Sequence, residues 1–157
     1  MKEWITFLLG MAPISELRGA IPFGLSVGLS LKKTLFLSVT GNILPIIPLL
    51  LFLEGISQWL IKNSRLFNKF FKWLFKHTRR HSALIERYET LGLFIIASIP
   101  LPMFGSWSGC AVAFIFGLPF WRSFLLISLG VLVAAVIVTS VVLGLVNLGQ
   151  LGSLMVK

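Results

Sequence analysis

The stretch "PISELRGAIP", residues 13–22, places a carboxylate and a guanidinium in an otherwise apolar part of the chain. Proline stands at both ends, at Pro13 and Pro22, and Glu16 and Arg18 lie two positions apart. Proline lacks a backbone N–H and disfavours helix in the residue before it. Residues two apart point to different faces of a helix but to the same face of extended backbone. We therefore expect an unwound stretch in which Glu16 and Arg18 face one shared cavity.

The composition around this stretch is that of an integral membrane protein. Of 157 residues, 57% are hydrophobic and 12% are charged, whereas a soluble domain carries about 25% charged residues. The mean hydropathy is +0.96. A chain of this length builds one compact bundle, so we predict a single transmembrane domain over residues 1–157.

The net charge of +9 is concentrated in one block. Eight basic residues and one acid lie between Lys62 and Arg87, so we expect no nucleic-acid partner. In "KNSRLFNKFFKWLFKHTRRH" the basic residues recur every three or four positions, with leucine and phenylalanine on another face. This pattern predicts an amphipathic helix over residues 62–80 that lies against anionic lipid headgroups. Short basic loops stay cytoplasmic, which places residues 62–88 inside and both termini outside.

The uncharged stretches do not all fit simple membrane crossings, which need about 20 apolar residues. Residues 34–53 and 123–156 each fit one crossing. Residues 4–15 and 19–31 are too short, and residues 90–121 are too long for one crossing but too short for two. Re-entrant segments, in which two half-helices enter and leave on the same side, explain these lengths. Non-helical backbone at membrane depth is tolerated only beside protein or water, so the two tips should meet.

The predicted tips are "PISELRGAIP" and "PLPMFGSWSG", both rich in residues that interrupt helices. We expect Pro13–Pro22 and Pro100–Gly109 to be non-helical near the membrane midplane. The outgoing half-helices would begin there, with Pro22 in the first turn of one and Ser106 or Ser108 capping the other. Two helix N-termini at one cavity favour an anion. The residues assigned to the tips are Pro13, Pro22, Pro100, Pro102, Gly105 and Gly109.

A weak internal repeat emerges when the chain is aligned with itself at an offset of 89 residues. The matched pairs include Pro13 with Pro102, Gly28 with Gly117, Lys33 with Arg122, Thr34 with Ser123, and Gly41 with Gly130. Each unit is a re-entrant hairpin plus one crossing, so the second unit is inverted relative to the first. The predicted fold is an all-α integral membrane protein with units 1–61 and 89–157 joined by the linker 62–88. We expect the small residues of the two long helices to let them pack closely, namely Gly41, Gly130, Ala134, Ala135 and Gly144.

Charged residues at membrane depth are costly and mark functional sites. The planar guanidinium of Arg18 suits a phosphate or a carboxylate. Glu16 is a candidate to bind and release a proton once it is removed from water. The alternative is an ion pair of Arg18 with Glu16 or Glu54 that only fixes the tip. We assign proton coupling to Glu16 and Glu54, and substrate binding to Arg18, Asn42, Ser106, Trp107, Ser108 and Arg122.

The sequence gives no support for a metal, a cofactor or an intramembrane enzyme. His77 and His81 lie four positions apart, but the cationic residues around them disfavour a metal ion. The chain has no aspartate and no histidine within an apolar stretch to act as a general base. The partners that we expect are membrane lipids, and a homo-oligomer is left open.

The stretch "PISELRGAIPFGLSVG", followed by "GNILPIIP", resembles the family of small multidrug export proteins. That family is considered a distant relative of the DedA/VTT superfamily. The resemblance covers nearly the whole chain, and E-L-R-G-A-I-P is its more specific motif. "GLPFWRSFLLISLGVL" is similar to a DedA stretch in which Arg122 matches the basic position. DedA-like proteins carry arginines in the second re-entrant tip, where this chain has none.

The resemblance implies two facing re-entrant segments in an inverted repeat, in the plasma (inner) membrane of a prokaryote. It also implies translocation of undecaprenyl phosphate or phospholipid that depends on the proton motive force. The expected function is thus a transporter or lipid flippase, coupled to protons, that moves an amphipathic anion. One alternative is an exporter of small cationic or neutral drugs with Glu16 as the coupling acid. Another is a membrane scaffold that transports nothing.

Overall fold

The computed structural model describes residues 1–63, 83–100 and 105–155. The predicted amphipathic helix over 62–80 therefore lies almost entirely outside the described residues, as do His77, His81 and Pro102. Within the described ranges the regular structure is α-helical, as predicted. In chain order the helices are α1 (Lys2–Met11), α2 (Glu16–Ser26), α3 (Leu31–Ile43), α4 (Ile46–Asn63), α6 (Ala83–Ser98), α7 (Ser106–Phe116) and α8 (Phe120–Met155).

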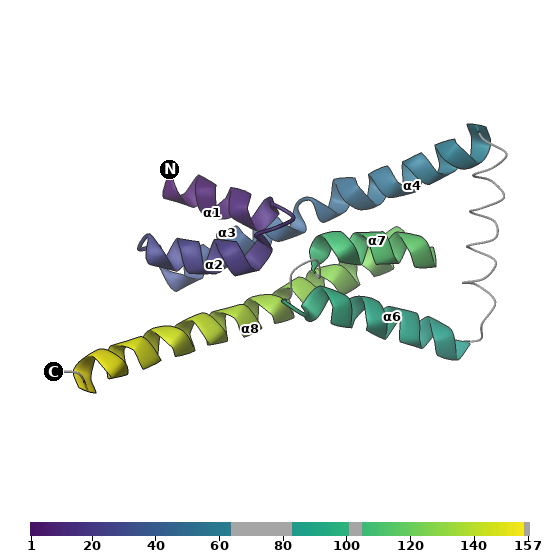
Figure 1. Ribbon diagram of the computed structural model, residues 1–157. Helices are drawn as coiled ribbons and strands as arrows, with labels where there is room; N and C mark the ends of the chain where they lie inside the picture. Colours follow the sequence, from purple (N-terminus) through teal and green to yellow (C-terminus); the bar gives the residue numbers. More distant parts are fainter. Residues whose placement is uncertain (64–82, 101–104, 156–157) are drawn as a thin grey trace.

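Two helical hairpins face each other in Figure 1. α1 and α2 form one hairpin and α6 and α7 form the other, and each approaches from a different end of the molecule (Figure 1). The C-terminal ends of α1 and α6 meet the N-terminal ends of α2 and α7 near the middle (Figure 1). The long helix α8 passes both hairpins and contacts α2, α3, α4, α6 and α7. The arrangement brings residues that are far apart in the sequence to one central point.

Two stretches, Leu31–Gly55 and Phe120–Val146, are long and apolar enough to cross a membrane. Many of their large apolar side chains point outward, and Leu125 and Val136 are 57% and 67% exposed. Apolar surface on this scale is unfavourable in water but not in lipid. The first stretch is interrupted where α3 ends and α4 begins, because Pro45 has no N–H to continue the helical ladder.

Glycines let each long helix pack against the hairpin that precedes it. A Cβ on Gly41 of α3 would overlap the Phe7 carbonyl oxygen of α1. A Cβ on Gly130 of α8 would lie 2.9 Å from the Ala97 carbonyl carbon of α6. The expectation that Gly41 and Gly130 pack the two long helices against each other is therefore wrong. Each glycine instead lets a long helix approach the first helix of its own hairpin closely.

The same kind of turn connects each hairpin to the long helix that follows it. Gly28 after α2 has φ +83°, and Gly117 after α7 has φ +66°. Both values lie in the left-handed region, which glycine adopts at little cost. The next residue in each turn, Leu29 or Leu118, donates its N–H back into the preceding helix at 3.0 Å. Both glycines were paired by the 89-residue offset.

The first tip is shorter than predicted. α2 begins at Glu16 and contains Pro22 in its interior, so the prediction that Pro13–Pro22 is non-helical is wrong beyond Ser15. Pro22 is also not in the first turn. Its missing N–H removes one helical hydrogen bond, whereas Ile21 beside it is fully buried in the core. Burial of a side chain of this size stabilises by about 1.5–3 kcal/mol, which offsets most of a proline's cost of about 3 kcal/mol.

The second tip is also shorter than predicted. α7 begins at Ser106, so the prediction that Pro100–Gly109 is non-helical is wrong for its last four residues. Gly109 lies inside α7, where a Cβ would come 3.2 Å from the Ile127 side chain of α8. This glycine serves helix packing and not a tip, because the close contact with α8 needs a small residue there. Pro100 and Gly105 remain outside helices, as predicted.

Candidate functional site

Glu16 begins α2 in a backbone conformation that non-glycine residues rarely adopt, with φ +45°. Its N–H donates to the Ala12 carbonyl at 3.0 Å, and the Ser15 hydroxyl before it donates to the Leu9 carbonyl. These bonds hold the turn between α1 and α2 in place. The residue is only 7% exposed. Strained backbone of this kind persists where the surroundings fix it and is concentrated at functional sites.

The Glu16 carboxylate lies against the backbone of Gly105, at the start of α7. A Cβ on Gly105 would come 2.7 Å from Glu16 Cδ and would overlap Oε2. The backbone N–H of Trp107 is hydrogen-bonded to the carboxylate. The N-terminal end of a helix carries a partial positive charge and free N–H groups. The start of α7 thus holds an anion that belongs to the chain itself.

Trp107 makes a second connection between the hairpins. Its indole N–H donates to the Met11 carbonyl at 3.3 Å. Met11 is the last residue of α1, where helical carbonyls lack partners within their own helix. The turn between α1 and α2 is therefore joined to the second hairpin at both of its ends, through Met11 and through Glu16.

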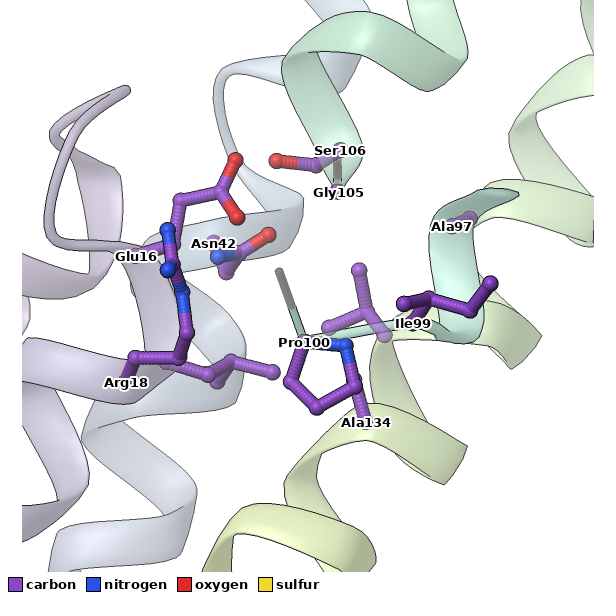
Figure 2. Close-up of a pocket in the computed structure, with 11 residues that line it drawn as sticks. Glu16, Arg18, Asn42, Ala97, Ile99, Pro100, Gly105, Ser106 and Ala134 are labelled. Atoms are coloured by element: carbon purple, nitrogen blue, oxygen red, sulfur yellow. The ribbon is translucent and has the colours of Figure 1, made fainter. Parts of the chain in front are cut away.

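A small cavity of about 10 Å³ lies beside these contacts, with room for about one water molecule. Figure 2 shows Glu16 and Ser106 pointing toward each other across it, with Arg18 and Asn42 beside them. Ser106 and Asn42 are only 2% and 1% exposed. Within the described residues, Ser106 Oγ and Asn42 Oδ1 have no hydrogen-bond partner. The residues that line the cavity are Glu16, Leu17, Arg18, Asn42, Ala97, Ile99, Pro100, Gly105, Ser106, Val131 and Ala134.

Arg18 is the third residue of α2, and its side chain is partly exposed. Its Nη2 donates to the Ile14 carbonyl at 3.4 Å, and its Nε is buried without a partner among the described residues. No ion pair joins Glu16 to Arg18 in the described chain, although the two charges interact electrostatically. The two side chains share the cavity, as expected, but for a different reason. Arg18 is helical, and Glu16, which has the positive φ, is the first residue of the same helix.

The structure brings some of the predicted site residues together and leaves others apart. Glu16, Arg18, Asn42 and Ser106 line the cavity with the tip residues Pro100 and Gly105. Ser108 instead accepts the Gly105 N–H at 2.9 Å, which stabilises the start of α7. The predicted residues that are described but lie outside the cavity lining are Pro13, Pro22, Glu54, Trp107, Ser108, Gly109 and Arg122, of which Pro13, Glu54 and Arg122 are exposed.

Sequence reasoning missed the apolar part of the cavity, which comes from α6 and α8. Ala97, Val131 and Ala134 line it, and each is at most 5% exposed. Small apolar residues in an apolar chain give no local indication of a site. The alignment of the chain with itself at an offset of 89 residues gave one indication of this lining. It pairs Val131 with Asn42 and Gly105 with Glu16.

The described cavity has room for about one water molecule, and its chemistry is that of one acid and one base among uncharged residues. Glu16 is the acid among its lining residues, and Arg18 is the basic residue. The other lining residues are uncharged. Among the described residues no three His, Cys, Asp or Glu side chains gather to hold a metal ion. A substrate larger than water would require the hairpin tips to separate.

Comparison with known proteins places the chain in a family. Residues 16–137 match the family described as "Putative small multi-drug export protein". The matched region begins at Glu16, directly after the first hairpin tip, includes the second tip and ends within α8. No curated protein and no solved structure matches the chain.

Proposed function

The chain belongs to the small multidrug export protein family, and on that premise we propose that it is a proton-coupled exporter with Glu16 as the coupling acid. It is a membrane protein, given the family and the two apolar spans. The observation that carries the proposal is the position of Glu16. It is a buried acid, held at the start of α7, and it joins two hairpins that must separate before anything larger than water can bind.

Protonation of Glu16 would weaken the contact between the hairpins. The ionised carboxylate accepts the Trp107 N–H and complements the positive end of α7. A neutral acid makes a weaker hydrogen bond and has no charge to place at the helix end. Proton uptake therefore favours separation of the tips, and proton release favours the closed arrangement. This is the two-state element that coupled transport requires.

We further propose that both hairpins are re-entrant and that the two units form an inverted repeat. Hairpins that approach from different ends, and left-handed glycine turns at Gly28 and Gly117, support this arrangement (Figure 1). Units 1–61 and 89–157 then make one domain, with the linker 62–88 cytoplasmic against anionic lipid. The protein would lie in the plasma (inner) membrane of a prokaryote. The distant relationship to the DedA/VTT superfamily is part of the same proposal.

The substrates of the exporter would be small cationic or neutral molecules. This follows the family description and the presence of one acid in the cavity. A second candidate is an amphipathic anion, such as undecaprenyl phosphate or a phospholipid. The observation that favours it is the buried Nε of Arg18, which lacks a partner in the described chain and lies near the N-terminal ends of α2 and α7.

The test of coupling is transport in proteoliposomes that contain purified protein. Ethidium serves as the cationic probe, and pyranine inside the vesicles reports proton movement. We expect the wild-type protein to move ethidium faster when a pH gradient is imposed, and Glu16→Gln to lose that dependence. Glu3→Gln is the matched control, because Glu3 is an exposed acid outside the cavity. A Glu16→Gln variant with unchanged gradient dependence would refute the coupling role.

The two substrate classes are separated by Arg18→Lys, which keeps the charge but loses the planar fork. If an anionic headgroup binds at Arg18, the variant should lose translocation of a fluorescent phosphatidylglycerol while ethidium transport continues. If the substrate is cationic or neutral, neither the variant nor the wild-type protein should move the labelled lipid. The lipid assay uses dithionite added outside the vesicles to bleach only the outer leaflet.

A further inference from the structure

A buried polar stripe runs along the inner face of α3 toward Glu16. Thr34, Ser38 and Asn42 lie four residues apart, so they share one face of the helix. Thr34 and Ser38 are 0% exposed, and Asn42 is 1% exposed. In the part of the chain that the structure describes, Thr34 Oγ1, Ser38 Oγ and Asn42 Oδ1 have no hydrogen-bond partner. Buried polar atoms without a partner are rare, and three in register on one helix need an explanation.

The stripe runs from the first turn of α3 to the cavity between the hairpins. Its inner end is Asn42, which lines the cavity with Glu16 (Figure 2). Its outer end is Thr34, one turn after the exposed Ser30, whose carbonyl accepts the Thr34 N–H at 2.9 Å. A helical rise of 1.5 Å per residue makes the stripe about 12 Å long. A few hydroxyl groups and waters suffice to bridge that length.

We propose that this stripe is the path along which protons travel between the surface and Glu16. The carriers are the Thr34 and Ser38 hydroxyl groups and water molecules that enter between them. In each step one O–H bond breaks and another forms, because a hydroxyl accepts one proton and passes on its own. No oxidant, reductant or metal takes part. The inference rests on the proposed function, since it supplies the proton that Glu16 exchanges, and polar residues within a membrane often form such relays.

A packing role for the same residues is the alternative. Glycines of the first hairpin contact the stripe: a Cβ on Gly24 would lie 2.6 Å from Thr34 Cγ2, and one on Gly10 would lie 2.7 Å from the Ser38 carbonyl oxygen. Small side chains on α3 let α1 and α2 approach this closely. Packing requires the size of these side chains but not their hydroxyl groups. The two roles therefore predict different effects when a hydroxyl is removed without a large change in volume.

The matching positions of α8 carry no equivalent stripe, although Ser128 and Thr139 elsewhere in α8 also have buried hydroxyl groups without a partner among the described residues. The 89-residue offset pairs Thr34 with Ser123, whose hydroxyl donates to the Pro119 carbonyl at 3.1 Å. It pairs Ser38 and Asn42 with the apolar residues Ile127 and Val131. The packing of α8 against α6 and α7 is thus achieved without unpartnered hydroxyl groups at these positions. Packing alone does not account for the stripe on α3.

The position of the stripe gives the path a direction. α3 begins at the end of the molecule where the N-terminus lies, and α4 ends at the opposite end (Figure 1). With residues 62–88 in the cytoplasm, as proposed above, the path opens on the outer side of the membrane. Protons would then enter from outside, which is the direction that the proton motive force favours.

The test compares Ser38→Ala and Thr34→Val with Ser123→Ala in the same proteoliposomes. Ser123 is a matched control because it is 0% exposed like Ser38, but its hydroxyl has a partner. The readouts are pyranine-reported proton movement, ethidium exchange without a pH gradient, and the thermal unfolding temperature in detergent. We expect proton movement to fall at least tenfold in Ser38→Ala and Thr34→Val, with ethidium exchange and the unfolding temperature unchanged or raised. Ser123→Ala should move protons as the wild-type protein does.

Two outcomes overturn the path, and they differ in what they say about the exporter. In the first outcome, the wild-type protein responds to the gradient and Glu16→Gln does not, but both hydroxyl variants move protons at the wild-type rate. The proposed path is then wrong, whereas the role of Glu16 as the coupling acid stands. If the wild-type protein shows no gradient dependence, the proposed coupling and the path both fail. Thr34→Val keeps the test open should Ser38→Ala not fold, because the two residues lie on the same stripe but contact different glycines.

Discussion

The carboxylate of Glu16 occupies the space that a side chain on Gly105 would fill. These residues lie in different hairpins, and each has a backbone φ in the left-handed half of conformational space, +45° and +151°. The contact joins the two halves of the chain at one point and positions the acid at the start of α7. A side chain at position 105 would therefore require the Glu16 carboxylate to move.

Gly105→Ala should displace Glu16 and separate the hairpin tips. The variant suffers a conformational cost of about 1–3 kcal/mol, because φ +151° with ψ −152° is a backbone conformation that is essentially restricted to glycine, and an overpacking cost of about 1–3 kcal/mol. Gly28→Ala is the control for a positive φ without overpacking, because Gly28 has φ +83° but no heavy atom within 4 Å of a Cβ. Thermal unfolding in detergent should show a larger loss for Gly105→Ala than for Gly28→Ala. Equal losses would mean that Glu16 moves aside freely.

Trp107→Phe should weaken the second connection between the hairpins. An aromatic ring is kept, but it is smaller, and the indole N–H that donates to the Met11 carbonyl at 3.3 Å is lost. A hydrogen bond of this kind contributes about 0.5–1.5 kcal/mol. Trp4→Phe is the control, because Trp4 is 70% exposed in α1. We expect the free energy of unfolding to fall only in Trp107→Phe, and equal stability of the two variants would contradict the contact.

Gly130→Ala should destabilise the packing of α8 against α6. An added Cβ would come 2.5 Å from the Ala97 Cβ and 3.1 Å from the Ser98 backbone nitrogen, and backbone atoms cannot give way cheaply. Overpacking of this type costs about 1–3 kcal/mol. Gly144→Ala in the same helix meets no atom within 4 Å, and alanine is favoured over glycine there by about 1 kcal/mol. Unfolding temperatures should therefore shift in opposite directions for the two variants.

The ion pair between Lys33 and Glu3 links the start of α3 to α1 and should respond to pH and salt. The hydrogen bond and charge of Lys33 lower the pKa of Glu3 from its ordinary value of 4.5. A lowered pKa means that the stabilisation is present above pH 4.5 and is lost as the pH falls through the pKa of the folded state. Both side chains are half exposed, so salt screens the pair. Lys33→Gln should have a small effect that disappears at high ionic strength, measured by thermal unfolding.

The sequence alone predicted the helical membrane fold and the approximate positions of the two tips. Hydrophobicity is a property of each segment, and Pro13, Pro100 and Gly105 interrupt helices through their own backbones, so local reasoning finds them. It also identified Glu16 and Arg18, because charges stand out in an apolar chain. The helical state of Pro22 was missed, because burial of its neighbours offsets the bond that it lacks.

Only the tertiary structure decided which residues meet. Glu16 and Gly105 are 89 positions apart, and their contact depends on how two hairpins pack against α8. The partners of Gly41 and Gly130 follow from the same packing, and so do the burial of the α3 stripe and the apolar lining of the cavity. Packing free energy is shared among many segments, whereas a sequence pattern reports on one segment at a time. The chain therefore determines its helices and its embedded charges locally, and the tertiary structure turns those charges into a site.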